Sequence, residues 1–553
     1  MGFKDFDNTP LEMGSVQSYN PMYSIFFPKE PSMDTLSLNH KYHIYDHTNV
    51  VDAKGKVKPC KIFIKHSPLL DPVHYLVGKY RKETEKIPIL PLPDHSNKDL
   101  GMEKVFDPNN ASYVDNFFNY LSSQMLHNHN LHNGIDYYGS NLVIQPRFRF
   151  NVYDDITYLQ ESEYFLKNNH KTYMMEDIQT PILTSEKNTQ SKRPKLRIDD
   201  EEPIDIGIED IICNDDSYND VESESKNEMI TEYLRDKSDD IDEDNNSEVS
   251  NSSAGSSDGS DCNNTDDEEN DDDDDDDDDD DEQDEDDDED DDETEELYAY
   301  LYDFPVQMIA LEQCDGTLDS LLEEKTLNNK EIAAALLQVI FTLIVYQKSF
   351  SFTHNDLHTN NIVFKQTDLK FLSYQYNGKH YKVPTYGRIY KIIDFGRSIY
   401  RYQDKILCSD SFAPGGDANG QYNSEPYFNS NKPRLEPSPG FDLCRLGCSL
   451  YDFMFEDEED EFNPDPKKMS ALQKTVHRWC QDDYGKNILY KRNGDERYPH
   501  FKLYKMISRM AHKHTPEAQL VDPLFSQFQS KAKMNGTTSL NIDIIPKYWN
   551  GEK

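Results

Sequence analysis

Apolar residues recur with a helical spacing in three parts of the chain. In residues 110–126 the apolar positions fall on one face of a helix, and they are Val114, Phe117, Phe118, Leu121 and Met125. Residues 329–350 form a long, mostly apolar run, and residues 441–455 form a shorter one. A helix that is apolar on nearly every side is buried, so we expect both runs in the interior of the protein.

Strand patterns lie before and between these helices. Polar and apolar residues alternate within residues 40–66, and strand-like runs follow at residues 141–153 and 297–312. The pair Asn377-Gly378 predicts the tip of a two-residue β-hairpin, because both residues tolerate a positive φ. Helices and strands are therefore mixed, and the expected fold class is α+β.

The negative charge is confined to one segment. The chain has 553 residues and a net charge of −49, but residues 199–296 alone contain 51 acidic and three basic residues. The rest of the chain is close to neutral, as in an ordinary globular protein. Residues 271–281 are an unbroken run of aspartate, which repels itself and buries nothing. We therefore expect a disordered acidic insertion over residues 186–296.

Cysteine usage and apolar segments indicate the compartment. The eight cysteines are scattered without a C-x-x-C pair, which does not suggest a metal site or a disulfide framework. The N-terminus lacks the apolar core of a signal peptide, and we expect no apolar stretch of membrane-spanning length. The sequence predicts an intracellular protein, cytoplasmic or nuclear, with no membrane partner.

Two short motifs carry the candidate chemistry. Between a buried helix and a strand, the chain places His354-Asn355-Asp356-Leu357-His358-Thr359-Asn360-Asn361, and further on Asp394-Phe395-Gly396. In this order, these motifs resemble the H-R-D-L-x-x-x-N loop and the D-F-G motif of the protein-kinase superfamily, with Asn355 in place of Arg. The aspartate of "FDLCRLG", Asp442, and Gly447 are similar to the start of the family's central helix, with Cys444 in place of Trp.

The resemblance implies a bilobal kinase-like fold and an ATP- and Mg²⁺-dependent reaction. Asp356 would orient the acceptor hydroxyl, and Asn361 and Asp394 would bind Mg²⁺ and the phosphates of ATP. The implied organisation is an N-terminal extension (1–40), a β-rich N-lobe (41–185), the acidic insertion (186–296), a hinge strand (297–314) and a helical C-lobe (315–553).

The adenine side of the site is implied by the strand that ends near Leu311. Leu311 would lie at the back of the adenine pocket, and Glu312 and Cys314 would offer backbone groups to the adenine edge. This assignment depends on the resemblance, because a strand, a loop and a helix in this order are common.

The phosphate-anchoring lysine is less clear. The family's Gly-rich loop is missing, and Ile62-Phe63-Ile64-Lys65 stands where V-A-I-K is expected. Lys65 is the first choice and Lys61 the alternative, because Phe63 would crowd the adenine pocket. Asp115 is the expected acidic partner of the lysine, and Glu103 is its rival.

Three functions remain open from the sequence. The first is a serine/threonine-protein kinase that acts on protein substrates, without direct binding of nucleic acid. The second is a kinase of small molecules, similar to the aminoglycoside phosphotransferases, because His358 stands where many protein kinases have Lys. The third is a non-catalytic scaffold whose acidic tract binds basic proteins. The degenerate N-lobe, the residue usage and the polyaspartate run are similar to those of kinase-like proteins of large DNA viruses, which adds a virion as a location.

Overall fold

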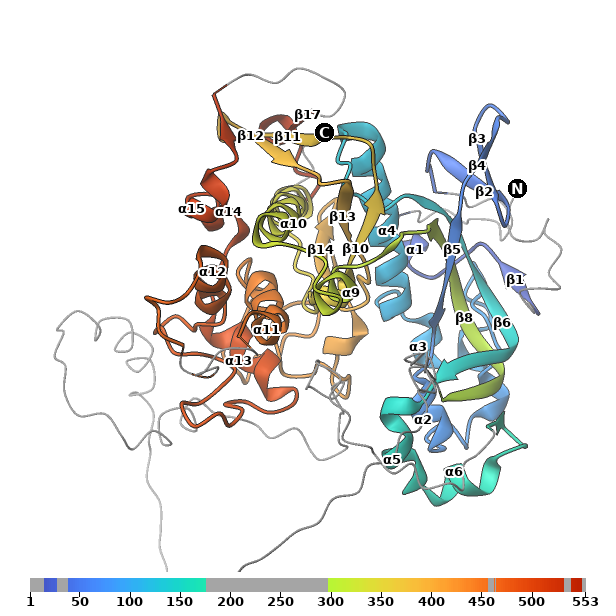
Figure 1. The fold of residues 1–553 in the computed structure, drawn as a ribbon. Helices are drawn as coiled ribbons and strands as arrows, with labels where there is room; N and C mark the ends of the chain where they lie inside the picture. The colour runs from blue at the N-terminus through green and yellow to red at the C-terminus, as the bar shows by residue number, and fades with distance from the viewer. Residues whose placement is uncertain are drawn as a thin grey trace, which may run out of the picture. The chain divides into compact units, whose positions relative to one another are not determined.

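The computed structural model describes residues 14–26, 38–175, 297–455, 462, 464–531 and 539–549, all within one unit of the chain (Figure 1). The expected acidic insertion, residues 186–296, lies outside the described residues, which stop at Met175 and resume at Leu297. The described chain is a mixture of helices and β-sheets, in agreement with the expected mixed composition.

The largest sheet is antiparallel and has the order β1-β6-β8-β5, with β7 paired to β8. Its strands are β1 (Val16–Gln17), β5 (Ile62–Pro68), β6 (Tyr137–Asn151), β7 (Tyr173–Met174) and β8 (Tyr298–Glu312). The strand that precedes residues 176–296 and the strand that follows them are therefore hydrogen-bonded neighbours. A smaller sheet contains β2 (Tyr42–Asp46), β3 (Asn49–Asp52) and β4 (Val57–Pro59).

Helix α4 (Ala111–His129) packs against β6 and β8 of the largest sheet and corresponds to the predicted helix of residues 110–126. Asn110 caps it, because its side chain accepts a hydrogen bond from the Ser112 backbone N–H. All five predicted apolar residues are buried. The helix also buries a polar stripe that the apolar pattern did not predict, which comprises Ser112, Asp115, Asn116 and Asn119. The short helices around it are α1 (Tyr23–Phe26), α2 (Pro72–Leu76), α3 (Glu103–Phe106), α5 (Ile156–Gln160) and α6 (Glu163–Asn168).

Helix α10 (Asn329–Phe350) has the predicted bounds. Asn328 and Glu331 form a capping box at its start, and Ser351 ends it with a left-handed φ of 49°. Among the described residues, α10 is the one helix long and apolar enough to cross a membrane, so the expectation that no such stretch exists was wrong. In the fold, 89% of that stretch is buried inside the protein, as in a core helix.

The second predicted apolar helix is α11 (Phe441–Phe455), which packs on α12 (Ala471–Trp479) and α13 (Lys502–Met510) (Figure 1). The approach of α11 to α12 is close, because a Cβ atom on Gly447 would lie 2.6 Å from the Cβ of Trp479. Two short helices follow, α14 (Pro516–Gln519) and α15 (Pro523–Ser526).

Short strands complete the structure around α10. The predicted hairpin is present as β11 (Phe371–Tyr376) and β12 (Lys379–Pro384), and Asn377 and Gly378 have φ values of 49° and 69°. The other elements are β9 (Gly316–Thr317), α9 (Leu318–Glu323), β10 (Ile362–Gln366), β13 (Arg388–Ile392), β14 (Ile399–Tyr402), β15 (Lys405–Cys408), β16 (Gln529–Ser530) and β17 (Ser539–Asn541).

Candidate active site

The loop between α10 and β10 is held by a buried carboxylate at the start of α11. Asp442 is completely buried and accepts hydrogen bonds from the backbone N–H groups of His354 and Asn355, at 3.0–3.1 Å. Burial raises the pKa of Asp442, and these donors act in the opposite direction. The loop backbone therefore depends on a residue about 90 positions away in the sequence, at the start of α11.

Asn355 ties the loop to the segment that follows Gly396. It has a left-handed φ of 66°, and its side-chain amide donates hydrogen bonds to the carbonyl oxygens of Thr353 and Arg397. The side-chain Oδ1 atom of Asn355 accepts a hydrogen bond from the Tyr422 hydroxyl at 2.7 Å. The position where the family has Arg is thus filled by a neutral, fully buried hydrogen-bonding group.

Asp356 lies on the same loop, and its side chain is 25% exposed. The Tyr504 hydroxyl donates a hydrogen bond of 2.6 Å to its Oδ1 atom, and Arg397 and Arg445 approach to 4.0 and 3.9 Å. Burial alone would raise the pKa of Asp356, but the two arginines, His358 and Tyr504 lower it to about 2. Asp356 is therefore an ionised, accessible carboxylate at neutral pH.

Asn361 and Asp394 lie beside this carboxylate and present oxygen atoms. The Asn361 amide donates to the Asp356 carbonyl oxygen at 2.9 Å, and within the described residues its Oδ1 atom accepts no hydrogen bond. Asp394 has a left-handed φ of 64°, and its side chain is 51% exposed. The nearby Lys65 charge lowers its pKa. No cluster of three or more His, Cys, Asp or Glu residues suited to a metal occurs in the described part of the chain.

Lys65 on β5 connects the large sheet to Asp394 and to Asp115 on α4. Its Nζ atom lies 2.7 Å from Oδ2 of Asp115 and 2.8 Å from Oδ1 of Asp394. Burial would lower the pKa of Lys65, but the two carboxylates raise it, so the ammonium group is charged. Asp115 is 1% exposed and also accepts hydrogen bonds from the Phe395 backbone N–H and the Asn119 side chain, at 2.8 and 3.0 Å.

The two alternatives to this pair are not in the site. Lys61 is exposed, and its backbone carbonyl accepts a hydrogen bond from the Gln313 N–H. Glu103 is exposed at the start of α3 and is not the partner of Lys65. Phe63 lies on the same face of β5 as Lys65, because they are two residues apart, and its side chain is 51% exposed.

At the end of β8, the side chains beside the expected adenine edge have partners of their own. Leu311 is 4% exposed and lies opposite Phe63 in the sheet register. The Glu312 carboxylate forms an ion pair of 2.5 Å with Lys391 on β13, and the Lys391 side chain is 5% exposed. The Asp136 N–H also donates to this carboxylate. Cys314 is half-buried, and burial raises the pKa of its thiol to about 12, so the thiol stays protonated. The side chain of Glu312 is therefore committed to an ion pair that the sequence did not suggest.

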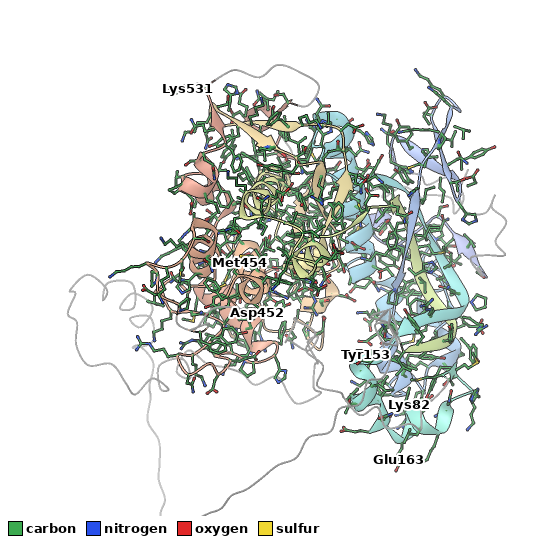
Figure 2. All side chains as sticks on the ribbon, viewed as in Figure 1. Lys82, Tyr153, Glu163, Asp452, Met454 and Lys531 are labelled. Carbon is green, nitrogen blue, oxygen red and sulfur yellow. The ribbon has the colours of Figure 1, made fainter. Side chains whose placement is uncertain are left out.

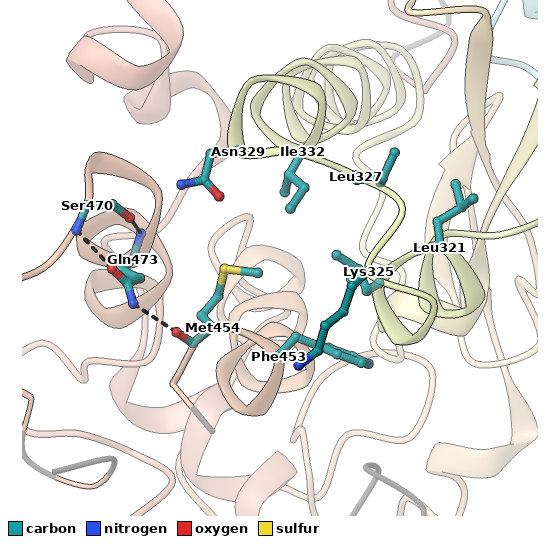
Figure 3. A pocket seen from close by; sticks show the side chains of 10 residues that line it. Leu321, Lys325, Leu327, Asn329, Ile332, Phe453, Met454, Ser470 and Gln473 are labelled. Atoms are coloured by element: carbon teal, nitrogen blue, oxygen red, sulfur yellow. Dashed lines mark hydrogen bonds between the residues drawn. The ribbon is translucent and has the colours of Figure 1, made fainter. Parts of the chain in front are cut away.

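A cavity of about 280 Å³ lies elsewhere, between α9, the start of α10 and the end of α11 (Figure 3). Its lining includes Leu321, Ile332 and Met454, and the Gln473 side chain donates to the Met454 carbonyl oxygen at 2.9 Å. None of the residues predicted from the motifs lines it. This cavity is therefore separate from the group of Lys65, Asp356 and Asp394.

Parts of the chain are similar in sequence to known protein kinases. No model of a protein family matches it. Serine/threonine-protein kinase haspin of Bos taurus is 39% identical over 88 residues, which are 16% of this chain and 11% of haspin. The haspin of Mus musculus is 33% identical over 101 residues, which are 18% of this chain and 12% of that protein.

A third relative is viral. A protein of Acanthamoeba polyphaga mimivirus, named as a candidate serine/threonine-protein kinase, is 28% identical over 190 residues. The match covers 31% of this chain and 44% of the viral protein. The chain thus spans less than half the length of each of these relatives. Together with the motifs, these similarities make the chain a protein-kinase-like protein.

Proposed function

We propose that this protein is an ATP- and Mg²⁺-dependent protein kinase that transfers the γ-phosphoryl group to serine or threonine hydroxyls of protein substrates. The observation that carries the proposal is the convergence of Lys65, Asp356, Asn361 and Asp394, which come from β5 and from two loops far along the chain. In this proposal the large sheet with α4 is the N-lobe, residues 315–553 are the C-lobe, and β8 ends in the hinge.

The residues present fit a hard cation bound with phosphates. The free Oδ1 atom of Asn361 and the half-exposed, ionised carboxylate of Asp394 are oxygen donors of the kind that Mg²⁺ prefers. Bound Mg²⁺ and ATP would supply the phosphoryl group and neutralise part of its charge. Leu311 and the backbone of Glu312 and Cys314 would receive the adenine.

The chain's own residues then have defined tasks. Asp115 holds Lys65 where its ammonium group can bind the phosphates, with Asp394 as its second partner. Asp356 orients the acceptor hydroxyl and receives its proton, and its low pKa keeps it ionised for this task. Asp442 holds the loop that carries Asp356.

The test is transfer of radiolabelled phosphate from ATP to casein, a histone mixture or an aminoglycoside. Asp356→Asn should lower turnover by roughly 10²–10⁴-fold while ATP binding survives, since a positioned general base contributes that much. Asp394→Ala should abolish transfer by removing a metal ligand. Asp404→Asn, at an exposed turn where Asn suits the positive φ, is the control with unchanged activity.

Each outcome identifies a different function. Labelling of the aminoglycoside alone would support a small-molecule kinase, the second alternative. No labelling of any acceptor, together with binding of histones, would support a scaffold that recruits basic proteins through residues 199–296. Unchanged activity of both Asp356→Asn and Asp394→Ala would refute the assignment of the site.

An intracellular location, in the cytoplasm, the nucleus or a virion, belongs to the same proposal.

A further inference from the structure

The Asp356 carboxylate is held from outside its own loop. Residues 352–361 contain no lysine or arginine, and burial lowers the pKa of His358 to about 4, so at neutral pH the loop itself supplies no cation to Asp356. Instead, Arg445 on α11 donates a hydrogen bond of 2.9 Å from its Nε atom to the Tyr504 hydroxyl oxygen. Tyr504 on α13 then donates from that hydroxyl to Oδ1 of Asp356, at 2.6 Å. Two helices that are remote in sequence thus meet at one carboxylate oxygen.

The two oxygens of Asp356 have different surroundings as a result. Oδ1 accepts the Tyr504 hydroxyl and has the Arg445 Nε atom at 3.9 Å. Oδ2 accepts no hydrogen bond from the described residues, and Arg397 stays 4.0 Å away from it because its NH2 atom binds Asp417 at 2.6 Å. The relay therefore leaves Oδ2 as the oxygen that can receive an acceptor hydroxyl.

Tyr504 is packed as a structural side chain. It is 4% exposed, and its ring stacks on Phe501 and lies near Phe441, with centroid distances of 5.6 and 6.3 Å. The Arg445 guanidinium lies 5.2 Å from the ring centroid as well as on the hydroxyl. The Tyr504 hydroxyl could instead occupy the place of the acceptor hydroxyl and leave when the substrate binds. That role would require the ring to move away, and the ring is enclosed by its neighbours.

We propose that Tyr504 and Arg445 are positioning residues of the reaction: together they hold Oδ1 of Asp356 so that Oδ2 faces the acceptor hydroxyl. This inference rests on the proposed kinase function. In this proposal each residue acts through Asp356 and needs no contact with the acceptor or ATP. A rotated carboxylate would still be ionised but would meet the acceptor hydroxyl less often in the productive geometry.

The first experiment compares Tyr504→Phe with Tyr490→Phe. Tyr490 belongs to the same hydrophobic cluster and donates its hydroxyl to a carboxylate, Asp452 (labelled in Figure 2), at 3.0 Å. Both variants lose a hydroxyl that donates to a carboxylate, and Tyr504→Phe also removes the acceptor of the Arg445 Nε–H, so its melting temperature should fall further than that of Tyr490→Phe. We expect Tyr504→Phe to lower kcat roughly 10- to 100-fold at an unchanged KM for ATP, as for a lost hydrogen bond to a charged group. Tyr490→Phe should retain the wild-type kcat.

A double-mutant cycle tests the relay. Arg445→Met should lower kcat by itself but add little in the Tyr504→Phe background, because both changes break one chain of contacts. Additive effects would overturn the role of Arg445. A Tyr504→Phe variant with the kcat of Tyr490→Phe would overturn the role of Tyr504, and one with a raised kcat would show that Tyr504 blocks the site.

A spectroscopic measurement separates this inference from the proposed function. The ultraviolet resonance Raman difference between the wild type and Tyr504→Phe should show a phenol that donates strongly to a carboxylate. The same difference taken in an Asp356→Ala background should lose that signature. If the wild type phosphorylates no acceptor, the proposed function fails, and the spectrum still decides whether Tyr504 holds Asp356. A signature that is unchanged by Asp356→Ala overturns the contact itself.

Discussion

Replacing Lys65 with methionine should separate the stability of the site from its binding of ATP. Lys65 makes two short contacts, to Asp115 at 2.7 Å and to Asp394 at 2.8 Å, and its side chain is 25% exposed. Methionine has a similar length and fills the same space without the charge. The change therefore leaves the Asp115 carboxylate, which is 1% exposed, without its cation.

The cost follows from the surroundings of the two carboxylates. Removing one partner of a buried ion pair typically costs about 3–5 kcal/mol. Asp115 retains two donors, the Phe395 N–H and the Asn119 amide, which lower this cost. The contact with Asp394 is half-exposed and adds at most about 1 kcal/mol. We expect Lys65→Met to reduce the free energy of unfolding by about 2–4 kcal/mol.

The measurement is urea unfolding together with ATP kinetics. Lys65→Met should also raise the KM for ATP and lower kcat, whereas Lys61→Met should change neither stability nor kinetics, because the Lys61 side chain is exposed. The double variant Lys65→Met/Asp115→Asn removes the buried charge but keeps an acceptor oxygen for the Phe395 N–H, so it should recover most of the lost stability but none of the ATP affinity. A larger effect of Lys61→Met, or full stability of Lys65→Met, would refute the reasoning.

Three further predictions concern the loop, a buried histidine and the acidic tract. Asp442→Ala should destabilise the protein by about 2–5 kcal/mol and lower kcat, since two buried backbone N–H groups lose their acceptor. Thermal melting and kinase assays should show a smaller loss for Asp442→Asn, which keeps an acceptor oxygen. Burial lowers the pKa of His40 to about 3, so below pH 6.5 the unfolded state binds a proton that the folded state does not. Stability should therefore fall with decreasing pH by up to about 1.4 kcal/mol per pH unit from this residue, and His40→Phe should remove that one-proton slope in urea unfolding between pH 6 and 4. Replacing residues 199–296 with a short Gly-Ser linker should leave melting and activity on a neutral peptide unchanged, because β7 and β8 on either side are paired strands and loop length changes closure entropy by only ~1–2 kcal/mol; a melting drop of many degrees would contradict this.

Local elements of the fold could be predicted because their signals lie within one short stretch of chain. The apolar run of α10 begins at a capping box and ends before a left-handed serine, and its predicted bounds agree with the structure. The Asn377-Gly378 pair forms its hairpin because both residues adopt a positive φ. The polar stripe of α4 was missed, since an apolar pattern alone does not reveal that a helix is buried on its polar side as well.

Some residues of the candidate site could likewise be predicted from local motifs, and others could not. The spacing of Asp356 and Asn361 was visible in the sequence because both lie on one loop, and Asp394 was visible because it stands in a short motif directly after a strand. By contrast, Lys65 could not be separated from Lys61, or Asp115 from Glu103, by pattern alone. Lys65 and Lys61 are four residues apart, and which of them meets Asp115 on α4 depends on how the sheet packs against the helix.

The sequence by itself thus determined the elements, the loop motif and the confinement of the charge to one segment. Only the tertiary structure brought Tyr504 and Arg445 to Asp356, and Lys391 to Glu312. In the sequence, Tyr504 and Arg445 look like ordinary members of helices, and no local pattern indicates that either meets Asp356. Tyr504 and Asp356 are 148 positions apart along the chain, and Lys391 and Glu312 are 79 apart. Arg445 and Tyr504 are 59 positions apart. Contacts over such separations are decided by how whole elements pack, because each helix or strand must first bury its apolar face and only then fixes which polar groups meet.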